Sequence, residues 1–113
     1  MSRPYIKRVT MFKVPKEEDI DAVIAKYGEM RSTAQKNGAP YIFSNEASRV
    51  LNSSEERAQG FTVIAITTFD SMEDVEYYDK ECAAHKKLRE FIATRRTGFA
   101  TLHFASELPK RKA

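Results

Sequence analysis

Apolar and polar positions alternate along three segments of the chain in the manner of β-strands, and a fourth carries apolar residues on both of its faces. Residues 5–14 (YIKRVTMFKV) and 99–105 (FATLHFA) are rich in β-branched and aromatic side chains. Residues 41–51 (YIFSNEASRVL) are polar enough for an irregular or edge strand. Residues 61–69 (FTVIAITTF) are apolar on both faces, which predicts a central strand.

Between the first two strands, apolar residues recur at helical spacing from Ile20 to Ala34. Pro15 and the acidic residues that follow it suit the first turn of a helix, where the N–H groups are free and the dipole is positive. The sequence NGAP at 37–40 predicts the end of this helix, with glycine as the cap and proline as the stop.

A second helix is predicted after the central strand. Asp70 and Ser71 suit its start, and it is expected to bend around residues 79–81 and to resume as 82–96 (CAAHKKLREFIATRR). The order is therefore β-α-β-β-α-β. This order predicts a ferredoxin-like α+β domain, with a four-stranded antiparallel sheet and both helices on one face.

The predicted strands carry two different faces. One set is almost entirely apolar: Val9, Met11, Ile64, Ile66, Leu102 and Phe104. The other set mixes bulk with polar groups: Arg8, Thr10, Phe12, Val63, Ala65, Thr67, Phe99, Thr101 and His103. A cavity with polar groups, closed partly by a second subunit, would account for both sets, so we expect a homodimer. The pattern leaves open which set faces the helices.

Length and composition exclude several classes of protein. We expect a single domain over residues 1–113, with its core over about 5–105 and a loose basic tail over 106–113. No apolar run is long enough for a membrane span, and the start of the chain does not resemble a secretory signal. With a single cysteine, Cys82, this indicates a cytoplasmic protein that does not bind membranes.

The charged residues point to no macromolecular ligand. The net charge is +3, but the basic residues fall on a helix and in the tail, and no basic strand carries exposed aromatic residues, so we do not expect nucleic-acid binding. Two histidines and one cysteine do not make a zinc pattern, and no glycine-rich nucleotide fingerprint occurs. We therefore expect no metal and no cofactor.

The segment FDSMEDVEYYDKECAAHKKLREFI, following the strand GFTVIAITT, resembles the stress-responsive A/B-barrel (Dabb) domain of the dimeric α/β-barrel superfamily. The opening IKRVTMFKV resembles the first strand of that family, and the resemblance spans about residues 5–105. It implies two ferredoxin-like subunits whose sheets close into one barrel. Members of the olivetolic acid cyclase type are polyketide cyclases that need no cofactor.

In those cyclases the essential pair is a tyrosine and a histidine, and Tyr78 and His85 match them in order and context. The turn between the two is one residue longer here and lacks the family's proline. Arg8 stands where the cyclase has a histidine, Tyr27 matches a pocket tyrosine, and Ile24 replaces an aromatic residue. The resemblance therefore does not imply a shared substrate.

The chemistry of these residues agrees with that comparison. A neutral imidazole can deprotonate carbon between two carbonyls, a phenol can donate a hydrogen bond to the enolate, and a guanidinium can hold an anion. We expect His85 as the base and Tyr78 as the donor in a barrel pocket. The expected substrate-binding residues are Arg8, Thr10, Phe12, Ile24, Tyr27, Val63, Ala65, Leu88, Phe91 and His103.

The leading prediction is thus a cofactor-independent cyclase or aldol-type lyase of secondary metabolism, acting on a polyketide-like, carbonyl-rich substrate. Two alternatives stay open: a non-catalytic stress-responsive homodimer that binds a hydrophobic ligand, and a cofactor-free monooxygenase. Structural roles also stay open for the named residues. His85 falls at the margin of the apolar stripe of its helix, and Tyr78 continues an apolar face that suits core packing.

Overall fold

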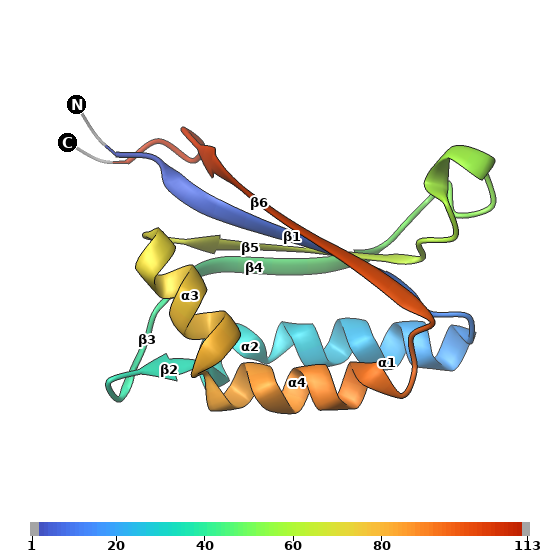
Figure 1. The fold of residues 1–113 in the computed structure, drawn as a ribbon, viewed down its shortest axis with the longest axis horizontal. Coiled ribbons are helices and arrows are strands. Elements are labelled where there is room, and N and C mark those ends of the chain that lie inside the picture. The colour runs from blue at the N-terminus through green and yellow to red at the C-terminus, as the bar shows by residue number, and fades with distance from the viewer. Residues whose placement is uncertain (1–2, 112–113) are drawn as a thin grey trace.

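Four strands form one antiparallel sheet in the computed structural model, which describes residues 3–111 (Figure 1). The strand order is β4-β5-β1-β6, where β1 is Tyr5–Lys13, β4 is Ile42–Arg49, β5 is Val63–Phe69 and β6 is Gly98–Ser106. The β-branched β5 is central and the polar β4 lies at an edge. This arrangement confirms the predicted ferredoxin-like fold.

The helices all lie on one face of this sheet, and the other face is uncovered (Figure 1). They are α1 (Glu17–Gly28), α2 (Met30–Thr33), α3 (Met72–Lys80) and α4 (Ala83–Ala93), and a 3₁₀ turn, η1 (Glu56–Ala58), lies between β4 and β5. Ser71 caps α3, because its hydroxyl accepts a hydrogen bond from the Asp74 N–H at 3.3 Å. None of the helices in the described part of the chain is long and apolar enough to cross a membrane.

The predicted end of the first helix was wrong. The helix stops at Gly28, and after the single turn of α2 the chain forms a small hairpin of β2 (Gln35–Lys36) and β3 (Ala39–Pro40). Asn37 and Gly38 connect these strands with φ of 54° and 79°. Asn-Gly is the favoured pair for a two-residue hairpin turn, in which both residues take positive φ, so the motif marks a turn and not a helix cap.

The strand positions that mix bulky and polar side chains face the helices. Arg8, Thr10 and Phe12 are buried there, beside Val63, Ala65 and Thr67 on β5. The apolar set lies on the uncovered face, where Leu102 and Phe104 are 56% and 50% exposed. A cavity among the polar positions therefore lies between the sheet and the helices of this chain.

The basic tail is folded back as far as the structure describes it. Arg111 forms an ion pair with Asp70 at 2.6 Å, and its guanidinium lies 3.9 Å from the ring centroid of Tyr5. These contacts tie the tail to β1 and to the start of α3, so the prediction of a loose end was wrong up to Arg111. Residues 1–2 and 112–113, which belong to the predicted domain and tail, lie outside the described residues.

Candidate active site between the sheet and α4

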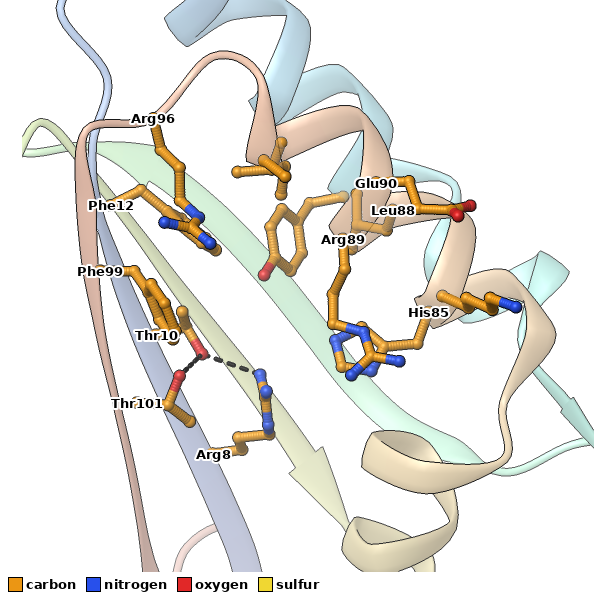
Figure 2. A pocket seen from close by; sticks show the side chains of 14 residues that line it. Arg8, Thr10, Phe12, His85, Leu88, Arg89, Glu90, Arg96, Phe99 and Thr101 are labelled. Carbon is orange, nitrogen blue, oxygen red and sulfur yellow. Dashed lines mark hydrogen bonds between the residues drawn. The ribbon is translucent and has the colours of Figure 1, made fainter.

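A pocket of about 330 Å³ lies between α4 and the strands β1 and β6 (Figure 2). This volume falls at the lower end of the range for small-molecule sites. Six of the residues that the sequence predicts for the site line it: Arg8, Thr10, Phe12, Tyr27, His85 and Leu88. Strand β1 supplies the first three, α1 supplies Tyr27, and α4 supplies the last two.

His85 is buried, with 2% of its side chain exposed, and not marginal as its helical position suggested. Its ring stacks on Tyr78, with centroids 3.7 Å apart and planes 13° apart. In one continuous helix, residues seven apart would stand about 10 Å apart along the axis. The break at Glu81 and Cys82 removes that separation, because α3 ends there and α4 starts in a new direction.

The same break fixes the tautomer of His85. The carbonyls in the last turn of a helix lack partners within the helix, and that of Tyr78 is one of them. His85 Nδ1 lies 2.7 Å from this oxygen. A carbonyl can only accept, so Nδ1 carries the proton, and Nε2 of the neutral ring keeps a free lone pair.

Burial lowers the pKa of His85 from 6.5 to about 4, assisted by the positive charges of Arg8 and Arg89 and opposed by the hydrogen bond to the Tyr78 carbonyl. The imidazole is therefore neutral at cellular pH. A buried neutral imidazole with one nitrogen fixed as donor and the other free has the protonation state of a general base.

Arg8 brings a buried positive charge to the floor of the pocket. Its Nη2 pairs with Asp79 Oδ1 at 2.9 Å, and its Nη1 donates to the Thr10 hydroxyl at 2.8 Å. Thr10 in turn lies 3.2 Å from Thr101 Oγ1 on β6 (Figure 2). The same Asp79 oxygen is 3.9 Å from His85 Nδ1, so one carboxylate holds the guanidinium and faces the imidazole.

Two tyrosine hydroxyls are candidates for the hydrogen-bond donor. Tyr27 lines the pocket, and burial raises its pKa to about 12 although Arg8 opposes the shift. Tyr78 does not line the pocket, its hydroxyl is buried without a partner among the described residues, and burial raises its pKa further. Both phenols therefore keep their protons at cellular pH and can donate.

The other predicted site residues lie away from the pocket. Val63 and Ala65 are buried in the core of the sheet, and Ile24 packs against that core. Phe91 lines a separate hollow between α1, α2 and α4. His103 is exposed on β6, opposite Arg8 in the register.

Eight further residues line the pocket and were not predicted for it: Lys86, Arg89, Glu90, Ile92, Ala93, Arg96, Phe99 and Thr101. Phe99 and Thr101 were available from the strand pattern, since they share a face with Arg8 and Thr10. The basic residues of α4 look like a solvated helix face in the sequence. Lys86 and Arg89 nevertheless line the pocket, because β6 starts shortly after the end of α4 and the pocket lies between the two elements.

No three His, Cys, Asp or Glu side chains within residues 3–111 gather in a way that could hold a metal ion. The pocket instead combines a neutral imidazole acceptor, a phenol, a buried guanidinium and an apolar wall. Together these groups can remove a proton from carbon and stabilise the oxyanion that results.

Fold and pocket together define a ferredoxin-like α+β protein with a ligand-sized site between its sheet and its helices. The model of the stress responsive A/B barrel domain family matches residues 6–99, and the chain belongs to that family. A fusaristatin A biosynthesis cluster protein of Gibberella zeae is 39% identical over 87 residues, which are 77% of this chain and 62% of that relative. The match thus spans less than two thirds of the relative's length.

Solved structures share the fold at lower identity. A hydroxynitrile lyase from Passiflora edulis superposes with a TM-score of 0.72 and 18% identity, over 99% of this chain and 100% of that one. A dimeric ferredoxin-like protein of unknown function from Thermobifida fusca superposes with a TM-score of 0.71 and 13% identity, over 93% of both chains.

Proposed function

We propose that this chain is a cofactor-independent cyclase or aldol-type lyase of secondary metabolism, acting on a polyketide-like, carbonyl-rich substrate as a cytoplasmic homodimer. The observation that carries the proposal is the fixed tautomer of His85, whose buried ring keeps Nε2 unprotonated at the pocket that Arg8 also lines. The relative in a biosynthesis cluster and the lyase of the same fold are consistent with it.

In the proposed reaction, His85 Nε2 removes a proton from the carbon between two carbonyls of the substrate. The electron pair of that C–H bond forms the enolate, whose oxygen is stabilised by Arg8 and by a tyrosine hydroxyl. The enolate carbon then attacks a second carbonyl of the same chain, and a C–C bond forms. Protonation of the new alkoxide and loss of water complete an aldol condensation, and a lyase runs the C–C step in reverse.

The low pKa of His85 makes stabilisation of the enolate the decisive factor. A base with a pKa of about 4 is weak, and each pKa unit of mismatch with the carbon acid costs 1.36 kcal/mol. The buried Arg8 guanidinium compensates, because an ion pair with the enolate is strongest where water is excluded. The negative charge of the enolate would also offset the positive charges of Arg8 and Arg89, which add to the effect of burial in lowering the pKa of His85.

Tyr27 is the better placed hydroxyl, because it lines the pocket. We therefore propose Tyr27 as the donor and keep Tyr78 as the alternative, since its unpartnered hydroxyl is the kind of buried group that functional sites retain. If Tyr27 is the donor, the role of Tyr78 is to position His85, by stacking on its ring and by accepting the hydrogen bond from Nδ1.

A linear tetraketide thioester tests the proposed reaction. We expect the wild-type chain to give a carbocyclic product, separated by liquid chromatography and mass spectrometry from the lactone that forms spontaneously. His85→Gln should lose this activity while keeping its circular dichroism spectrum, and His103→Gln, which changes the exposed histidine, should keep it. Equal turnover by His85→Gln would exclude the assigned base, and no product above background would favour the non-catalytic, ligand-binding alternative.

The uncovered face of the sheet supports the homodimer. Leu102, Phe104 and Phe43 are exposed apolar side chains on this face, and Val9, Met11, Ile64 and Ile66 are half-buried beside them. Exposed apolar patches of this kind mark interaction sites. The dimeric state of the Thermobifida fusca protein, which shares the fold, suggests that a second copy of the chain covers it.

A further inference from the structure

The arginines of the chain fall into two groups by their partners. The chain has nine arginines, all within residues 3–111. Six of them form ion pairs with acidic side chains: Arg3, Arg8, Arg49, Arg57, Arg95 and Arg111. Within the described residues Arg31, Arg89 and Arg96 form none, and two of these three line the pocket. The protein thus neutralises most of its guanidinium groups but leaves the pair at the pocket without a counter-charge.

The two arginines point into the pocket from α4 and from the turn that follows it (Figure 2). Arg96 is half-buried, and its guanidinium lies 4.3 Å from the ring centroid of Phe99, so the aromatic ring holds it over the opening. Arg89 descends toward His85, and its charge contributes to the lowered pKa of that imidazole. Glu90 is the one acidic residue among the described lining residues, and Figure 2 shows its carboxylate pointing away from both arginines.

We propose that Arg89 and Arg96 bind an anionic group of the substrate, so that the enzyme takes an acidic carbonyl compound in preference to its neutral ester. This inference rests on the proposed function and names its substrate class. The guanidinium fork matches carboxylate and phosphate oxygens in the same way, so the anion is either a free carboxylate or the phosphate of a carrier thioester. Phe12, Leu88 and Phe99 form an apolar wall for the carbon chain.

The position of the anion has a consequence for His85. The positive charges of Arg8 and Arg89 both disfavour its protonated form. An anion bound at Arg89 cancels part of that positive potential and raises the pKa of the imidazole in the complex. The base therefore becomes stronger when a substrate of the right charge is bound, which selects such substrates at the chemical step as well as at binding.

Calorimetric titration with four probes tests the anion site: 3-oxo-octanoate, its methyl ester, and the coenzyme A and N-acetylcysteamine thioesters of the same acid. Each is titrated into wild type, into the double variant Arg89→Gln/Arg96→Gln, and into Arg31→Gln. The last variant is the control, because Arg31 lies on α2 and is the one unpaired arginine of the described residues that does not line the pocket. We expect wild type and Arg31→Gln to bind an anionic probe at least tenfold more tightly than its neutral counterpart. The double variant should lose this preference.

The four probes also separate the two sources of the anion. Preference for the free acid over its methyl ester identifies a carboxylate, and preference for the coenzyme A thioester over the N-acetylcysteamine thioester identifies a phosphate. The inference is overturned if no probe binds, if neutral and anionic probes bind alike, or if Arg31→Gln weakens anion binding as much as the double variant does. Because the readout is binding, its failure leaves the turnover test of His85 unaffected.

Discussion

Removing the His85 imidazole should change how the stability of the protein depends on pH. In the folded state burial holds the pKa of His85 at about 4, whereas its ordinary value is 6.5. Between these two values the unfolded chain binds a proton that the folded chain does not bind. Stability linked to His85 is therefore fully present above pH 6.5 and is lost as the pH falls toward 4.

The magnitude follows from the width of that window. Each pH unit within it costs 1.36 kcal/mol, so lowering the pH from 7 to 5 should remove about 2 kcal/mol from the free energy of unfolding through His85 alone. Burial is the main cause of that pKa shift, and 2% of the side chain is exposed. His85→Gln lacks the titrating group and should not show this part of the loss.

Urea unfolding of wild type, His85→Gln and His103→Gln at pH 7 and pH 5 measures the effect. The acidic side chains are the same in all three proteins, so the difference between variants isolates the imidazole. We expect wild type and His103→Gln to lose about 2 kcal/mol more than His85→Gln. An equal loss in all three, or a His85 NMR titration with a midpoint near 6.5, would refute the buried neutral imidazole.

Four further substitutions test the site and the assembly. Asp79→Asn leaves the buried Arg8 guanidinium without its counter-charge and should cost about 2 kcal/mol of unfolding free energy; an unchanged urea midpoint would contradict the pair. Tyr27→Phe should lower turnover about 100-fold. Tyr78→Phe removes an unpartnered hydroxyl and should leave the free energy of unfolding unchanged or raised. If Tyr78→Phe lowered turnover and Tyr27→Phe did not, Tyr78 would be the donor. Leu102→Asp should convert a dimer into a monomer in sedimentation at micromolar concentration; a wild-type monomer would overturn the interface.

The fold could be predicted because its signals are local. The β-branched run of β5, with apolar residues on both faces, identifies a central strand, and the cap at Ser71 marks the start of a helix regardless of what packs on it. The motif at Asn37 and Gly38 was also local, but it is common to helix ends and hairpin turns. Its neighbours, residues 35–36 and 39–40, are too short to show a strand period, so the pattern could not separate the two.

The site depends on how elements meet, and this limited its prediction. A helical wheel places His85 relative to its own helix, whereas its burial comes from the stacked ring of Tyr78 on the preceding helix. Arg89 and Arg96 look like solvated charges in sequence, because their approach to the pocket is set by the return of β6. Arg8 and Thr10 were predictable, since a charge and a hydroxyl at buried strand positions need polar partners.

A crystal structure with a β-keto ligand that cannot cyclise, such as 3-oxo-octanoate, tests the central claim most directly. We expect the ligand in the pocket between β1, β6 and α4, with its acidic carbon about 3–3.5 Å from His85 Nε2. Its carbonyl oxygen should face Arg8 and Tyr27. A ligand held on the uncovered face of the sheet, or one in the pocket with Nε2 turned away from it, would contradict the account.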